Sequence, residues 1–183
     1  MKTMEDVFTI KEWMALPEGF PAQLFDGQLV REPSPTYGHQ GLVGDVYLRL
    51  RALLGRARVV VSPADVVIDE LNVLQPDVCV LREIPPRDSH DVGIPVIVFE
   101  VLSPSTATRD RTLKTDKYLA AGVEEVWIVD GEAGTLEVRS RDGARVAHGQ
   151  EALASRTLPS LRLVPADLFQ DDGETPAAGC ADS

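Results

Sequence analysis

The sequence predicts a mixed α/β (α+β) protein, with a central mixed β-sheet flanked by helices and preceded by an N-terminal helix and a β-hairpin. Two patterns support this prediction. Short apolar runs at residues 96–99 and 126–129 have the length of strands that are covered on both faces. Residues 40–54 and 108–121 instead have the composition and spacing of helices. Chains that interleave such strands and helices place the helices on the faces of the sheet.

Length and composition fit an ordinary globular protein. The chain has 183 residues, of which 44% are hydrophobic and 26% charged, which suits one domain with a full core. We expect residues 1–169 to form that single domain. Residues 170–183 hold four acids and no base, and their composition predicts a disordered tail.

The net charge is −11, and the chain without its acidic tail still carries −7. Such a balance counts against a general nucleic-acid-binding surface, which is normally basic. It does not exclude a local site, because the field is local and a bound metal inverts it. No apolar run approaches the length of a membrane span, and residues 1–6 do not resemble a signal peptide, so we expect a cytoplasmic protein without membrane partners. Cys79 and Cys180 lack metal-ligand spacing and do not predict a disulfide framework.

The N-terminal elements are predicted from spacing and from turn residues. Residues 7–16 suit a short amphipathic helix that ends at residues 17–19, and residues 23–30 suit a hairpin with its turn at Asp26 and Gly27. Residues 40–54 form the strongest predicted helix, with Ser34 or Thr36 as its cap and Gly55 at its end.

The remaining elements follow in order. Apolar runs predict strands, and Pro, Gly and polar clusters predict the connections. The predicted strands are 59–61, 66–68, 74–81 (with Asp77 near its start), 96–102, 125–130, a more exposed strand at 136–139 and a weak one at 144–148. Residues 84–93 are predicted as a loop, residues 103–106 as the cap of the helix at 108–121, and residues 165–169 as a final helical turn.

Glu100 is the residue that suggests chemistry, because it lies inside an apolar strand. A buried carboxylate is costly unless a charged or hydrogen-bonding group meets it, so it indicates either a structural ion pair or a functional site. Asp77 also borders an apolar run, 23 positions earlier. Two adjacent carboxylates repel each other unless a cation lies between them, and Mg²⁺ prefers such oxygen ligands. With Lys114 nearby, the set matches the needs of metal-dependent phosphodiester hydrolysis.

Several motifs make this interpretation more specific. They are residues 23–30 (QLFDGQLV), 33–35 (PSP) with His39 and Gln40, 75–78 (QPDV), 100–106 (EVLSPST), Asp110 and Arg111 with Lys114 and Tyr118, 121–123 (AGV) and 126–130 (VWIVD). In this order the chain resembles the Uma-type family of restriction-endonuclease-like proteins, within the broad PD-(D/E)XK nuclease group.

The resemblance implies a restriction-endonuclease-like core with a divalent metal, Mg²⁺ or Mn²⁺ as its substitute. It implies that Asp77, Glu100 and the backbone carbonyl of Val101 ligate this metal. The usual Lys of the group lies two residues after the second acid, where this chain has Leu102. Lys114 matches the position from which the family's following helix supplies a Lys, whereas Lys117 does not.

The chain also departs from the family at the hairpin. Gln23 and Gln28 stand where the family usually carries Glu, and a neutral amide is a poorer cation ligand, which puts catalytic competence in question. His39 matches a recurring family position, with capping as an equal alternative. Tyr118 either hydrogen-bonds in the site or simply packs.

The sequence thus favours a Mg²⁺-dependent endonuclease that hydrolyses DNA through Asp77, Glu100 and Lys114. Cutting both strands of a duplex commonly uses two active sites, so a homodimer is expected. One alternative is a non-catalytic binding or assembly module that keeps the nuclease fold, which the negative charge and the two Gln residues favour. Another makes Asp77 and Lys114 a buried structural ion pair.

Overall fold

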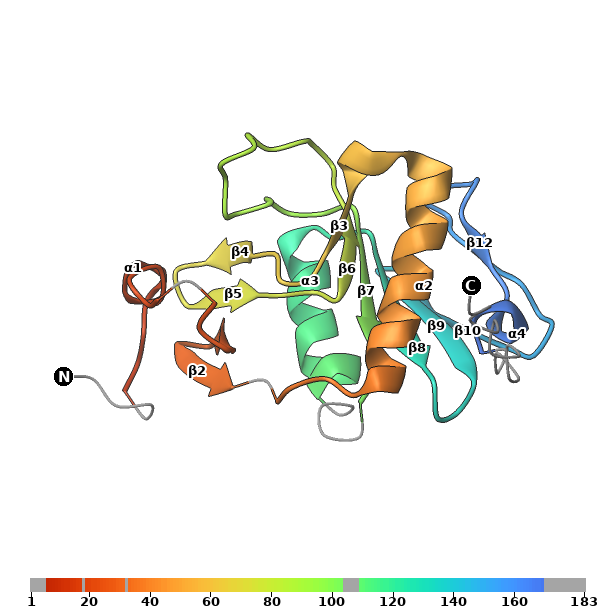
Figure 1. Ribbon diagram of the computed structural model, residues 1–183, viewed down its shortest axis with the longest axis horizontal. Coiled ribbons are helices and arrows are strands. Elements are labelled where there is room, and N and C mark those ends of the chain that lie inside the picture. Colours follow the sequence, from red (N-terminus) through yellow and green to blue (C-terminus); the bar gives the residue numbers. More distant parts are fainter. Residues whose placement is uncertain (1–5, 18, 32, 104–108, 170–183) are drawn as a thin grey trace, which may run out of the picture.

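The computed structural model describes residues 6–17, 19–31, 33–103 and 109–169. Its centre is a six-stranded sheet of order β10-β9-β8-β7-β6-β3 (Figure 1). Only β7 and β8 pair in parallel, because the chain crosses the sheet through α3 between them. The predicted mixed sheet flanked by helices is therefore confirmed. The strands are β3 (Val59–Val61), β6 (Val78–Val80), β7 (Ile97–Val101), β8 (Glu125–Asp130), β9 (Thr135–Ser140) and β10 (Gly143–His148).

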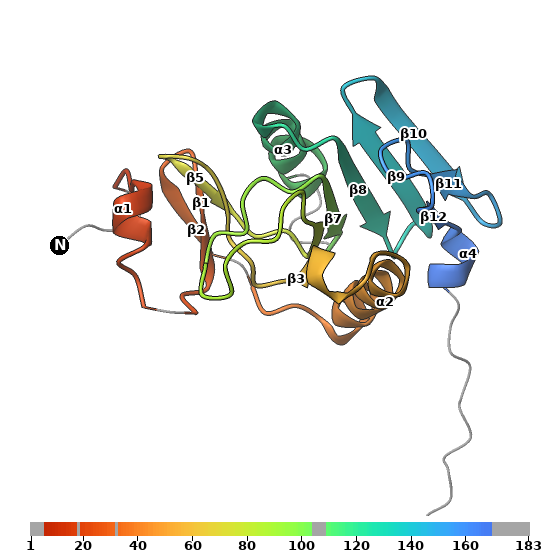
Figure 2. The same cartoon turned by 90° about the horizontal axis from the view of Figure 1, so that it is seen from above.

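Two helices cover opposite faces of this sheet, as Figure 2 shows: α2 (Tyr37–Leu54) and α3 (Thr115–Ala121). Side chains alternate across β7, so Phe99 packs in the cluster on the α2 side and Val98 in the cluster on the α3 side. By the same alternation Glu100 lies on the α3 face. The residues that can contact this carboxylate therefore come from the connection between β7 and β8, which contains α3.

A second sheet, of order β2-β1-β5-β4, lies beside the first (Figures 1 and 2). It consists of β1 (Ala22–Phe25), β2 (Gln28–Arg31), β4 (Val66–Asp69) and β5 (Asn72–Leu74). The predicted hairpin is confirmed: Asp26 and Gly27 have φ of 49° and 76°, the positive values that a tight hairpin turn requires. The sequence did not indicate that this hairpin belongs to a separate sheet.

The N-terminal helix is shorter than predicted. α1 spans only Ile10–Trp13, not residues 7–16. The amide of Phe8 donates to the carbonyl of Gly27 at 2.6 Å, and that of Ile10 donates to Glu70 at 2.7 Å. These bonds hold the chain against the second sheet just where the predicted helix would begin.

α2 begins three residues earlier than predicted. The Thr36 hydroxyl accepts the His39 amide at 3.2 Å and caps the helix, so His39 lies in the first turn instead of before the helix. Gly55, with φ of 82°, ends the helix as expected. The helix predicted at residues 108–121 begins as a π-helical segment, Arg109–Lys114, and continues as α3, which Gly122 caps. Residues 104–106 of its predicted cap, and the predicted tail 170–183, lie outside the described residues.

Two strand predictions were wrong in part. Residues 74–81 do not form one strand, because residues 75–77 separate β5 from β6 and the two belong to different sheets. β9 is buried along most of its length, although residues 136–139 were expected to be more exposed. Its Leu136 and Val138 pack with apolar side chains of the C-terminal segment. That segment contains β11 (Leu153–Ala154), β12 (Arg162–Leu163) and α4 (Pro165–Leu168), of which only the final helical turn was predicted.

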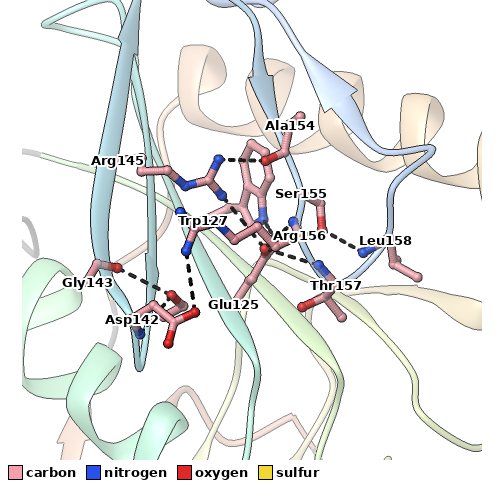
Figure 3. Close-up of polar contacts among 11 residues, drawn as sticks. Glu125, Trp127, Asp142, Gly143, Arg145, Ala154, Ser155, Arg156, Thr157 and Leu158 are labelled. Carbon is pink, nitrogen blue, oxygen red and sulfur yellow. Dashed lines mark hydrogen bonds and ion pairs between the residues drawn. The ribbon is translucent and has the colours of Figure 1, made fainter.

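A buried carboxylate anchors this C-terminal segment to the sheet. Glu125, at the start of β8, accepts hydrogen bonds from the Trp127 indole at 3.0 Å and the Ser155 hydroxyl at 2.7 Å (Figure 3). The amides of Arg156 and Thr157 donate to its other oxygen at 2.6 and 3.3 Å. Because so many donors meet it, Glu125 is a structural acid.

No helix among the described residues has the length and apolar character to span a membrane.

Candidate active site

A cleft of about 410 Å³ opens between the first hairpin, the start of α2 and the edges of β6 and β7. Five of the six side chains that the sequence singled out line it: Gln23, His39, Asp77, Glu100 and Lys114, together with Val101. Tyr118 lies behind the cleft wall and reaches it through Glu100. Residues from five separate parts of the chain thus come together.

The antiparallel pairing of β6 with β7 brings the two acids together. Val78 pairs with Phe99, so Asp77, directly before β6, lies at the same end of the strand pair as Glu100. Both acids line the same cleft, which is the arrangement that a shared cation needs.

Asp77 is partly buried and held from two sides. Its Oδ2 accepts the Val101 amide at 2.7 Å and lies 3.5 Å from Nε2 of His39. The hydrogen bond from the Val101 amide holds the carboxylate of Asp77 against β7. His39, from the first turn of α2, contacts the acid and not merely its own helix.

Glu100 is buried, with 3% of its side chain exposed, and meets two groups on the α3 face of the sheet. Its Oε1 accepts the Tyr118 hydroxyl at 3.0 Å, and its Oε2 lies 3.6 Å from Nζ of Lys114. Burial and the charge of Glu100 raise the pKa of Tyr118 well above its usual value. The hydroxyl therefore stays protonated and remains a donor at neutral pH. Burial and the same charge raise the pKa of the neighbouring Cys79 thiol to about 12.

Lys114 reaches the cleft from the last position of the π-helical segment. Such segments change the direction of side chains relative to a regular helix and often occur at functional sites. Lys117, one turn further on, instead pairs with Asp26 and lies 4.6 Å from the centre of the Phe25 ring. Of these two lysines, Lys114 lines the cleft and Lys117 does not. The structural ion-pair alternative assigned Lys114 to Asp77, whereas in the structure its Nζ lies 3.6 Å from Glu100.

Gln75 was not singled out as a site residue, although it lies two positions before Asp77. The Oε1 of Gln23 accepts the Gln75 amide at 2.9 Å, and the Gln75 side chain donates to Asp65 at 2.8 Å. Both bonds hold the segment that leads into Asp77. Gln28 is exposed on β2 and does not line the cleft.

The oxygen-rich donor set fits a hard divalent cation. Mg²⁺ is commonly held by one or two carboxylates, with water and substrate oxygens completing its shell. Asp77 and Glu100 supply two carboxylates in one cleft, and Val101 lines the same wall. Within the described ranges, no three His, Cys, Asp or Glu side chains gather as a metal-binding group.

Comparisons with known proteins agree with this fold. The family model "Uma2: Putative restriction endonuclease" matches residues 10–168. The chain is also similar to the crystal structure of a protein from Anabaena variabilis ATCC 29413, described as "a putative nuclease belonging to DUF820". The TM-score is 0.77 at 20% sequence identity, over 88% of this chain and 97% of that one. The sequence matches none of the curated proteins.

Proposed function

Because the chain belongs to the Uma2 family, which is described as "Putative restriction endonuclease", we propose that it is a Mg²⁺-dependent endonuclease that hydrolyses phosphodiester bonds in DNA. The single observation that carries this proposal is that Asp77, Glu100 and Lys114 line one cleft, with Nζ of Lys114 3.6 Å from Glu100. Mn²⁺ is the expected substitute for Mg²⁺.

Asp77 and Glu100 would hold the metal, helped by the carbonyl of Val101. When bound, the metal supplies Lewis-acid stabilisation of the phosphate and lowers the pKa of a bound water. Lys114 places a positive charge where negative charge develops on the scissile phosphate, or orients the attacking water. A metal and a lysine also offset the two acids locally, so the negative charge of the whole chain does not prevent phosphate binding here.

Two further residues act by holding the ligands. The Tyr118 hydroxyl fixes one oxygen of Glu100, and His39 with the Val101 amide fixes one oxygen of Asp77. Such outer contacts orient metal ligands and commonly change metal affinity when removed. Each acid thus enters the cleft with one oxygen already oriented by the protein. We propose a homodimer, since double-strand cleavage commonly uses two sites.

The test combines DNA cleavage with metal titration. The purified chain should cut plasmid and oligonucleotide DNA with Mg²⁺ or Mn²⁺. Asp77→Asn and Lys114→Met should each lower the rate by about 10²-fold or more. Asp116→Asn is the matched control, because Asp116 is an exposed acid on α3 that does not line the cleft, and it should leave the rate unchanged.

A second candidate is a nuclease-fold binding module without catalysis. Its supporting observation is that Gln23, a neutral amide, occupies the cleft beside the two acids and uses its oxygen to hold Gln75. Calorimetric titration with Mn²⁺ separates the two. Binding that Asp77→Asn weakens, accompanied by cleavage, supports the nuclease. Absence of such binding contradicts it and favours the module.

A further inference from the structure

A second cleft, of about 570 Å³, adjoins the candidate active site. Pro63 and Gln75 line both clefts, so the two spaces meet at these residues. The hydrogen-bonded series from Gln23 through Gln75 to Asp65 runs from one cleft into the other. The two clefts are therefore neighbours that share part of their lining.

The walls of the second cleft are largely apolar and aromatic. Trp13 and Met14 come from the N-terminal segment around α1, and Phe20 from the loop that leads into β1. Val60 and Pro63 also line this cleft. A volume of about 570 Å³ is within the range of small-ligand pockets, roughly 300–1,000 Å³.

The polar residues that line this cleft include an acid. Asp65 lines it with Gln75, Ser89 and His90, and none of the described lining residues is Lys or Arg. A carboxylate accepts several hydrogen bonds, so Asp65 keeps acceptor capacity beyond the bond from Gln75. Two aromatic rings with acceptors nearby fit a flat, uncharged heterocycle that carries N–H donors.

We propose that this cleft receives one unstacked base of the DNA strand whose phosphate lies at Asp77, Glu100 and Lys114. This proposal rests on the proposed nuclease function. Trp13 and Phe20 supply the apolar and aromatic surface for the base, and Asp65 with Gln75 accepts and donates hydrogen bonds at its edge. The cleft then acts as a specificity pocket for one nucleotide beside the cleavage position.

The test measures binding of short single-stranded and duplex oligonucleotides in which an abasic site replaces each base in turn. Ca²⁺ replaces Mg²⁺ so that bound DNA is not cut. Stacking of one base on an aromatic side chain corresponds to about fivefold or more in affinity. We therefore expect an abasic site to weaken binding by at least about fivefold at one position and to have little effect elsewhere.

Two variants locate the effect. Phe20→Leu removes a ring from the second cleft while keeping an apolar side chain. It should lower affinity for intact DNA by about fivefold and leave affinity for the abasic DNA unchanged. Phe25→Leu is the matched control, because Phe25 is a partly buried ring on β1 that lines neither cleft, and it should change neither affinity.

The outcomes distinguish this inference from the function on which it rests. DNA binding and Mg²⁺-dependent cleavage with a flat abasic profile would overturn the base pocket and leave the nuclease intact. Absence of DNA binding overturns both. If Phe20→Leu fails to fold, the abasic profile of the unchanged protein still decides the question.

Discussion

Glu125→Ala should lower the free energy of unfolding more than the replacement of any other acid that lies outside the cleft. The carboxylate is buried, and four donors converge on it from Trp127, Ser155, Arg156 and Thr157 (Figure 3). Each buried donor that loses its acceptor costs about 1–3 kcal/mol, with some recovery through relaxation or water. Breaking a buried charged network typically costs about 3–5 kcal/mol, and we expect a loss of that size in the free energy of unfolding. Small domains have only about 5–15 kcal/mol in total.

The neighbouring residue provides the control. Glu124 is the same amino acid one position earlier, but it is exposed and pairs with Arg82 at 3.0 Å. Glu124→Ala should cost no more than about 1 kcal/mol, because exposed ion pairs are weak. Urea unfolding followed by far-ultraviolet circular dichroism measures both, and avoids the direct effect of the substitution on Trp127 fluorescence. A loss below 1 kcal/mol for Glu125→Ala, or equal losses for the two variants, would refute the reasoning.

Three further outcomes concern the site. Gln23→Glu adds a third carboxylate to the cleft and should tighten Mn²⁺ binding in calorimetry by about tenfold or more; weaker binding would contradict a metal between the acids. Tyr118→Phe removes one hydrogen bond to Glu100 and should lower the cleavage rate about tenfold with the fold kept by circular dichroism; an unchanged rate would make Tyr118 a packing residue. The pKa of Cys79 is raised from 9.0 to about 12, so its thiol stabilises the folded protein below pH 9 and this contribution declines as pH rises toward 12, by about 1.4 kcal/mol per pH unit. Urea unfolding from pH 8 to 10.5 should show a shallower decline for Cys79→Ala, and identical slopes would contradict the burial of a protonated thiol.

The parts of the fold that local chemistry decides were predictable from the sequence. Asp26 and Gly27 determine a tight turn by their own backbone preferences, and Thr36 and Gly55 delimit α2. The division of residues 74–81 was not predictable in this way. It depends on whether β5 pairs with β4 and β1 or with the central sheet, and that choice is made by partners distant in sequence.

The candidate site was likewise only partly predictable from the sequence. Asp77 and Glu100 could be proposed because each borders an apolar run, and Lys114 because it matches a family position. The structure brings all three to one cleft. Their pairing could not be proposed, since Lys114 meets Glu100 only through the crossover geometry of α3. β9 was expected to be exposed because Glu137 and Arg139 alternate with apolar residues. These two charges pair with each other, and the C-terminal segment covers the apolar positions between them.

The parallel pairing of β7 with β8 has a consequence for folding. Some contacts of the candidate site can form before others. Glu100, Lys114 and Tyr118 lie within one strand–helix–strand unit, so their contacts close only a short loop of chain. Asp77 joins them only when β6 pairs across the long loop before β7, and Gln23 only when the second sheet docks. Contacts between distant segments form slowly. During refolding, burial of Trp127 should therefore precede the appearance of Mn²⁺ affinity, which makes the metal a reporter of the last step of assembly.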